Sequence, residues 1–184
     1  MEIRAAQPGD EGAWERQHGE ALAFAQKYGA GRISPAAFRA LLKLSPRDLS
    51  QPGSSLLLAR IHAEDGERLA AVCCVTDYGR GLCLVVVHPL YRGRGLGSRL
   101  LSEQLALLGR LSCRVALGHV SSLQMCFRAG LYASGLIHAP GGKPVLLLEK
   151  SLASPESEES AAHFSKEGDL FATPRPGHLD FISQ

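Results

Sequence analysis

The stretch VVVHPLYRGRGLGSRLL, residues 85–101, decides how the rest of the chain is interpreted. It begins with three valines, which favour a β-strand, and ends with leucines at the spacing of an amphipathic helix. Between strand and helix, three glycines stand at alternate positions: Gly93, Gly95 and Gly97. Glycine lets the backbone turn sharply and approach a ligand closely, and the start of the helix offers unpaired N–H groups and a partial positive charge. Because Arg92 and Arg94 add formal charge, the stretch predicts a turn that binds phosphate or diphosphate.

Two other phosphate-binding loops fit this stretch poorly. The P-loop of nucleotide hydrolases needs a lysine after its glycines, and none follows here. The dinucleotide-binding turn needs a third glycine at position 98, where this chain has Ser98. It also needs an acidic residue about 20 positions on, where this chain has only apolar residues, 115–117. Both alternatives therefore fail on spacing.

Composition predicts one soluble globular domain. The chain has 184 residues, of which 45% are hydrophobic and 21% charged, and this length can bury a substantial core. The formal net charge is only +2 and the basic residues form no block, so we expect no nucleic-acid partner. No apolar run approaches the length of a membrane span, and the N-terminus lacks the apolar stretch of a signal peptide. We therefore expect a cytoplasmic protein without a membrane partner.

The five cysteines are odd in number and lie mostly in apolar segments, where free cysteine packs as a small hydrophobe. They form no Cys-x-x-Cys pair and no cysteine–histidine cluster with zinc spacing. The sequence therefore predicts a reducing compartment, no disulfide framework and no metal site.

Apolar periodicity and turn residues predict a mixed α/β (α+β) order of elements. The expected strands are residues 2–7, 56–62, 69–76, 82–87, 115–119, 131–138 and 144–149, and the expected helices are residues 10–24, 34–44, 97–109 and 122–129. A mixed sheet with helices on both faces would bury these elements in one domain, residues 1–150. Residues 151–184 are acidic and polar at their start (SPESEES, 154–160), and we expect them to form a flexible tail.

Residues 85–101 resemble motif A of the GNAT acetyltransferases, which transfer an acyl group from acyl-coenzyme A to an amine. The family's diphosphate loop reads Gln/Arg-x-x-Gly-x-Gly/Ala, which Arg92, Gly95 and Gly97 satisfy. The predicted element order matches the GNAT fold, a mixed and mostly antiparallel sheet with helices on both faces, across about residues 1–150. The resemblance implies that backbone N–H groups of the loop hold the diphosphate of acetyl-CoA. It also implies that the strand at 85–87 splays from its neighbour and pairs with the pantetheine arm.

The resemblance carries these roles to ten positions of this chain. The expected cofactor-binding residues are Val85, Val86, Val87, Arg92, Gly93, Arg94, Gly95, Leu96, Gly97 and Ser98.

The family's catalytic carboxylate has no counterpart on the expected strand. Many GNAT enzymes place it on the strand before motif A, and the corresponding position here lies near Cys83. The nearest acids are Asp77 and Glu103, which we interpret as a turn residue and a solvated helix residue.

A second family segment reads Asn-x-x-Ala-x-x-x-Tyr-x-x-x-Gly-Phe, and its tyrosine often protonates the leaving thiolate. Residues 119–131 resemble it, with His119 at the asparagine position and Cys126 at the tyrosine position. Cys126 is therefore the candidate acid, since the reference pKa of a thiol is about 8.5, and His119 is a candidate general base. The competing interpretations are a space-filling role for Cys126 and a local hydrogen-bonding role for His119.

The function expected from the resemblance is N-acetyl transfer from acetyl-CoA to a primary amine by direct attack in a ternary complex. The acceptor is a small molecule or a peptide, bound by the N-terminal helices and the last strands, with residues 22–33 and 139–143 as the segments of interest. The alternative is a GNAT-fold acyl-CoA-binding or regulatory module with little or no turnover. A homodimer is left open.

Overall fold

The computed structural model describes residues 1–63, 66–138 and 142–152. Its strands form two antiparallel sheets, one in the order β1–β2–β3–β4 and one in the order β5–β7–β6. The strands are β1 (Glu2–Ala5), β2 (Ser55–Ala63), β3 (Gly66–Thr76), β4 (Leu82–Val87), β5 (Arg110–Ala116), β6 (Tyr132–His138) and β7 (Pro144–Ser151).

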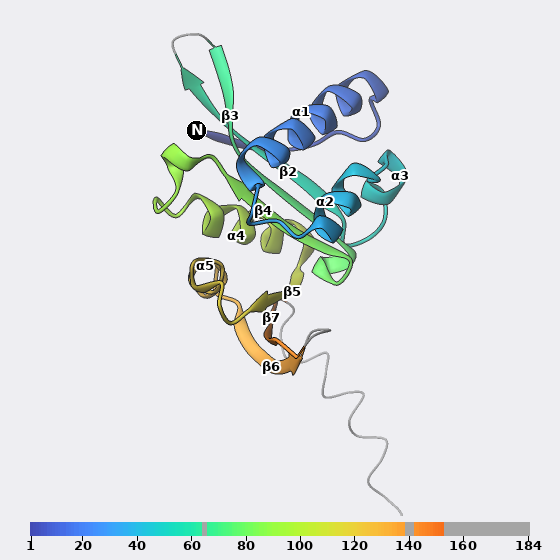
Figure 1. The fold of residues 1–184 in the computed structure, drawn as a ribbon. Helices are drawn as coiled ribbons and strands as arrows, with labels where there is room; N and C mark the ends of the chain where they lie inside the picture. Colours follow the sequence, from blue (N-terminus) through green and yellow to red (C-terminus); the bar gives the residue numbers. More distant parts are fainter. Residues whose placement is uncertain (64–65, 139–141, 153–184) are drawn as a thin grey trace, which may run out of the picture. The chain divides into compact units, whose positions relative to one another are not determined.

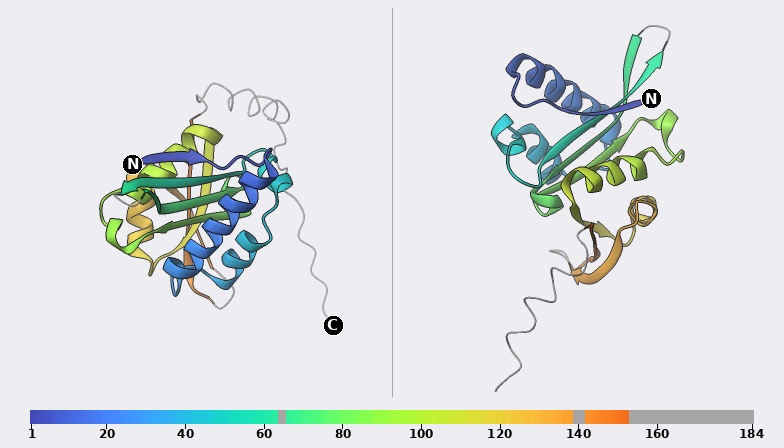
Figure 2. Two further views of the ribbon diagram at one scale, coloured as in Figure 1. Left: turned by 90° about the horizontal axis from the view of Figure 1, so that it is seen from above. Right: turned by 180° about the vertical axis from the view of Figure 1, so that it is seen from behind.

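Helices cover both faces of the four-stranded sheet (Figures 1 and 2). One face carries α1 (Glu11–Gly29) and α2 (Pro35–Leu42), and the other carries α4 (Leu96–Leu108). The remaining helices are α3 (Pro46–Leu49) and α5 (Val120–Arg128), with short 3-10 turns η1 (Asp77–Gly79) and η2 (Pro89–Tyr91). The predicted α/β fold, a mostly antiparallel sheet with helices on both faces, is confirmed, although the strands form two antiparallel sheets rather than one mixed sheet.

The first helices begin where their capping residues predict. The carboxylate of Asp10 accepts a hydrogen bond from the Ala13 N–H at 3.0 Å, and Ser34 caps α2 with Pro35 at the first helical position. The sequence Ser45-Pro46 follows the expected helix at residues 34–44. It also starts the short helix α3, because Ser45 and Asp48 cap one another's backbone N–H groups.

Two cores lie on the two faces of the four-stranded sheet because side chains alternate along its strands. On β3, Cys73 packs toward α4 while Cys74 packs toward α1 and α2. On β4, Val85 takes the α4 side and Val86 the α1 side. All five cysteines are free thiols.

The predicted boundaries of β5 were wrong. The strand was expected at residues 115–119, but it begins at Arg110 and ends at Ala116. Its first half alternates exposed Arg110 and Arg114 with buried Leu111 and Cys113, the pattern of a strand with one buried face.

Strands β4 and β5 begin close together, although they belong to different sheets. The turn η1, which precedes β4, packs against β5, and a side chain at Gly79 would meet the carbonyl oxygen of Ser112. Beyond this contact the two strands form no ladder in the described part of the chain. The strands are therefore linked near their beginnings by the turn η1 and not by a ladder of hydrogen bonds.

The described residues end at Leu152, whose N–H donates to the carbonyl of Gly109 at 2.7 Å. The predicted tail from residue 153 onward lies outside the described residues, as do residues 64–65, between two expected strands, and residues 139–141 of the segment expected to bind the acceptor. Within the described part, no helix has the length and apolar character needed to span a membrane.

Candidate acyl-coenzyme A site

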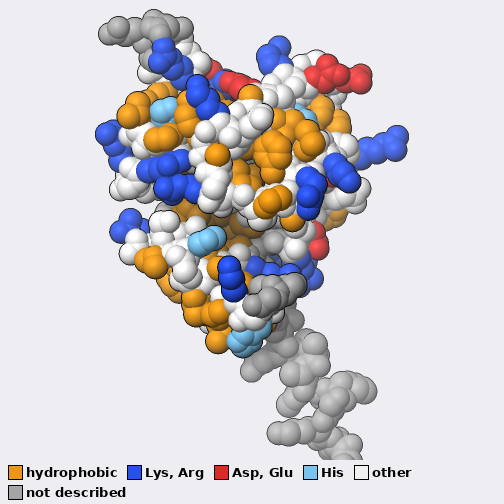
Figure 3. All heavy atoms as spheres, in the orientation of Figure 1, with side chains coloured by type: hydrophobic (Ala, Val, Ile, Leu, Met, Phe, Trp, Pro, Cys, Tyr) orange, Lys and Arg blue, Asp and Glu red, His pale blue; other side chains and the backbone are white. Residues whose placement is uncertain are grey.

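A cleft of about 570 Å³ opens at the end of β4. Its walls are the β4 residues Val85–Val87, the glycine loop (residues 92–97), the start and one face of α5, and the connection from α1 to α2. Figure 3 shows the hollow between the part of the molecule that carries α1 and the part that carries α5.

The glycine loop presents backbone N–H groups to this cleft. Gly93 and Gly95 have φ of +74° and +79°, in the left-handed region that favours glycine. Gly95 is the N-cap of α4 and has no side chain to cap it, and the first helical bond runs from the Arg99 N–H to the Gly95 carbonyl at 3.0 Å. The N–H groups of Gly97 and Ser98, in the first turn, therefore have no intrahelical partner. Both residues line the cleft, so the helix offers it an anion site.

Gly97 lets α5 pack closely against the start of α4. A Cβ placed on Gly97 would lie 2.4 Å from the sulfur of Met125. The third glycine of the loop thus serves helix packing, whereas Gly93 and Gly95 serve the turn.

The free edge of β4 faces away from β3. The His88 N–H donates to the Ala70 carbonyl on β3 at 2.9 Å, so the backbone groups of Val85 and Val87 point to the opposite edge. The Val87 carbonyl there accepts from the Nε of Arg92 at 2.9 Å. Val85 is thus placed to offer its N–H and C=O to an extended ligand lying along the strand.

Arg92 lines the cleft, but it also ties the end of α1 to the end of β4. Besides its bond to Val87, its Nη2 donates to the Tyr28 carbonyl at 2.8 Å. Partial burial and the nearby charge of Arg32 lower the pKa of Arg92. Two of the donors expected to meet a diphosphate are therefore engaged by the protein itself.

The arginines that line the cleft differ from those that the sequence analysis expected there. Arg94 is exposed and is not among the residues that line the cleft. Arg32, in the α1–α2 connection, and Arg128, in the last turn of α5, do line it. Residues 22–33 were expected to contribute to the acceptor pocket, but nothing in the sequence singled out Arg32 or Arg128.

The structure does not favour Cys126 as a catalytic acid. Its side chain is 2% exposed, and it is not among the cleft-lining residues, although Met125 beside it is. Its sulfur lies 3.6 Å from that of Cys113, and this contact and burial raise the pKa of the Cys126 thiol. Leu123, Cys126 and Ala129, at helical spacing, form the inward face of α5.

We expect Cys126→Ala to leave the turnover rate unchanged. Loss of the buried sulfur should lower the free energy of unfolding by about 1–2 kcal/mol through the small cavity it leaves. Thermal denaturation and a steady-state assay of thiol release would measure the two effects. A fall in kcat of tenfold or more, with the fold intact, would restore Cys126 as a catalytic residue.

His119 lies in the cleft wall. It is the N-cap residue of α5, and its exposed side chain borders the cleft. Its backbone is fixed, because its N–H donates to the Ala116 carbonyl at 2.9 Å and its carbonyl accepts from the Ser122 N–H at 2.9 Å. The imidazole is therefore carried on a well-defined turn at the entrance to α5.

The two carboxylates nearest to motif A lie outside the cleft lining. Asp77 forms the turn η1, as expected, and Glu103 faces Arg99 on the surface of α4 at 3.9 Å. Among the described residues, no cluster of three histidine, cysteine, aspartate or glutamate side chains could hold a metal ion.

Comparison with known proteins agrees with this geometry. A family model described as an acetyltransferase (GNAT) domain matches residues 58–134, which include β3, β4, the glycine loop, α4 and α5. No curated protein sequence matches the chain.

Several solved structures share the fold. A GNAT-family acetyltransferase from Streptococcus pneumoniae superimposes with a TM-score of 0.59 at 19% identity, covering 83% of this chain and 99% of its own. A candidate acetyltransferase from Salmonella typhimurium, solved with acetyl-CoA, gives 0.55 at 16% identity, covering 84% of this chain and 95% of its own. A spermidine N-acetyltransferase mutant from Vibrio cholerae gives 0.55 at 13% identity, covering 82% and 93%. At these identities the likeness shows the fold alone.

Three features agree with one another: the glycine loop, the order of the elements, and the cleft at the end of β4. Residues 58–134 match the model of the acetyltransferase (GNAT) domain, and the chain has the fold of solved GNAT acetyltransferases.

Proposed function

We propose that this protein is an N-acetyltransferase that transfers an acetyl group from acetyl-CoA to a primary amine by direct attack in a ternary complex. One observation carries the proposal: the uncapped N-terminus of α4 and the free edge of β4 border the same cleft. A diphosphate joined to an extended amide-containing arm, as in coenzyme A, matches both features at once.

The loop would hold the diphosphate mainly through its backbone. The N–H groups at the start of α4 supply donors and the positive end of the helix dipole. Gly93 and Gly95 leave open space on their Cβ side, so no side chain separates a phosphate from these donors. Arg92 would contribute charge more than hydrogen bonds, because two of its donors already bind carbonyl groups.

The edge of β4 would position the acyl group. The N–H and C=O of Val85 can pair with the amides of the pantetheine arm, and an N–H group on this edge can polarise the acyl carbonyl. Acetyl-CoA supplies a thioester that an amine can attack. Holding the two substrates side by side accounts for much of the rate in such a site, with few demands on side chains.

His119 is the residue we assign to proton uptake from the attacking amine. It borders the cleft and sits on a fixed turn. His119→Gln keeps much of the size and polarity but removes the basic nitrogen, so kcat should fall by about 100-fold. Affinity for CoA should change less than threefold.

His62→Gln is the matched control, because His62 is exposed on β2 and is not among the cleft-lining residues. Steady-state kinetics of all three proteins, together with CoA titrations, would separate catalysis from binding. Equal kcat values for wild type and His119→Gln would remove His119 from the mechanism.

An acyl-CoA-binding module without turnover is the second candidate. It is favoured by the absence of Asp and Glu among the described cleft-lining residues, and by the burial of Cys126. Release of free thiol from acetyl-CoA, measured with and without a panel of primary amines, distinguishes the two functions. An enzyme releases thiol in an amine-dependent manner, whereas a binding module is protected from thermal denaturation by CoA and releases none.

A further inference from the structure

The cleft carries positive charge on several of its walls. Arg32 comes from the α1–α2 connection, Arg92 from the glycine loop and Arg128 from α5. None of the described residues that line the cleft is an aspartate or a glutamate. Figure 3 shows Lys and Arg side chains bordering the hollow. Such a site attracts anions and repels additional positive charge.

Arg32 and Arg92 form an uncompensated pair. The charge of Arg32 lies near enough to contribute to the lowered pKa of Arg92, after the larger effect of burial. Neither Arg32 nor Arg92 forms an ion pair with another residue in the described part of the chain. An anion bound beside Arg32 would relieve this repulsion.

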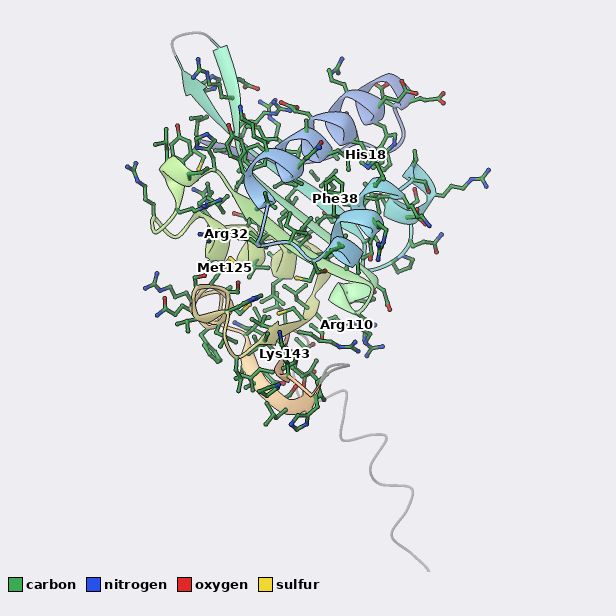
Figure 4. The ribbon with its side chains drawn as sticks, in the orientation of Figure 1. His18, Arg32, Phe38, Arg110, Met125 and Lys143 are labelled. Atoms are coloured by element: carbon green, nitrogen blue, oxygen red, sulfur yellow. The ribbon has the colours of Figure 1, made fainter. Side chains whose placement is uncertain are left out.

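The diphosphate of acetyl-CoA already has its own donors at the start of α4. Arg32 lies on a different wall, in the connection that follows Gly29 and Gly31, and Figure 4 shows it across the gap from Met125 of α5. The Arg32 N–H donates to the Gly29 carbonyl at 2.9 Å, which fixes the backbone that carries the side chain. Its guanidinium can bind a planar carboxylate through two parallel hydrogen bonds.

We propose that the acceptor is an amine that also bears a carboxylate, and that Arg32 binds this carboxylate. The inference rests on the proposed function, since it names the substrate class of the same cleft. A polyamine acceptor is disfavoured, because each further ammonium group would enter a cleft bordered by three arginines. The shared fold of the spermidine N-acetyltransferase therefore does not extend to its acceptor.

The test is a calorimetric titration of acceptors into the full chain saturated with CoA. Because CoA carries no acetyl group, an acceptor can bind to this complex without being acetylated. The probes are matched carboxylate and carboxamide pairs: 4-aminobutyrate with 4-aminobutanamide, alanine with alaninamide, and an acidic tripeptide with its amide analogue. Spermidine serves as the polycationic probe. The variants are Arg32→Gln and the control Arg39→Gln, an exposed arginine of α2 that is not among the cleft-lining residues.

We expect at least one carboxylate to bind about tenfold or more tightly than its carboxamide. Arg32→Gln should remove this preference and change the affinity for CoA less than threefold, while Arg39→Gln should preserve both. The proposal is overturned if no carboxylate in the set is preferred, if spermidine binds most tightly, or if Arg32→Gln weakens CoA and leaves the preference intact.

Together with the assay of amine-dependent thiol release, the titration also separates this proposal from the proposed function. Arg32-dependent carboxylate binding without any acetyl transfer would contradict the enzyme assignment and support a carboxylate-binding site at Arg32. Acetyl transfer that prefers carboxamides or spermidine would support the enzyme assignment and contradict carboxylate binding by Arg32.

Discussion

Gly95→Asp is expected to weaken CoA binding by at least about 100-fold, or about 2.7 kcal/mol. The new carboxylate would stand at the N-cap of α4, where Gly95 leaves the first-turn N–H groups free for a diphosphate. It would compete for those donors and bring a negative charge against the phosphates. Isothermal titration of CoA into wild type and variant measures the loss.

Folding should be little affected, so the loss can be read as a binding effect. A Cβ at Gly95 meets open space, and the strain of φ +79° is partly offset by the favourable position of a carboxylate at a helix N-terminus. The matched control is Gly109→Asp, at the other end of the same helix, with φ +75° and open space around its Cβ. If both variants bind CoA like the wild type, the loop is not the diphosphate site.

Gly79→Ala is expected to lower the free energy of unfolding by about 3–5 kcal/mol. Gly79 has φ +92°, and its Cβ would lie 1.8 Å from the carbonyl oxygen of Ser112 on β5. Because the clashing atom belongs to the backbone of a strand, it cannot rotate away, and the clash adds to the cost of the left-handed conformation. Chemical denaturation followed by circular dichroism measures the change.

This contact also bears on the site. The turn at Gly79 holds the beginnings of β4 and β5 together, while the cleft lies at their far ends. Gly109→Ala is the control for conformational strain, since that position also has a positive φ but meets no neighbour, and about 1 kcal/mol is expected for it. Equal losses of unfolding free energy in the two variants would show that the clash with Ser112 does not contribute to the effect of Gly79→Ala.

The glycine loop could be located from sequence because its features are local. Positive φ at Gly93 and Gly95, an uncapped helix start and a preceding apolar strand all follow from neighbouring residues. For the same reason the starts of the helices expected at residues 10–24 and 34–44 agree with the caps Asp10 and Ser34.

Contacts between distant segments could not be read in the same way. Arg92 was expected to face a diphosphate, yet it also donates to the carbonyl of Tyr28, 64 positions earlier. Arg32 reaches the cleft only because the α1–α2 connection folds over the end of β4. Neither placement leaves a periodic signal in the sequence.

For Cys126, by contrast, the neighbouring sequence does contain a signal that its side chain is buried. The apolar residues Leu123, Cys126 and Ala129 repeat at helical spacing and mark the buried face of α5. Alignment to the family's tyrosine position suggested a catalytic residue, whereas the spacing within this chain indicates a core residue.

The most direct test of the account is a mass balance of the reaction. Purified protein, acetyl-CoA and a primary amine are mixed, and thiol, acetylated amine and intact protein are quantified over time by mass spectrometry. Direct transfer in the cleft predicts one acetylated amine for each thiol released, with no acetyl group retained on the protein and no reaction in Gly95→Asp. Thiol release without acetylated amine, or full activity in Gly95→Asp, would contradict it.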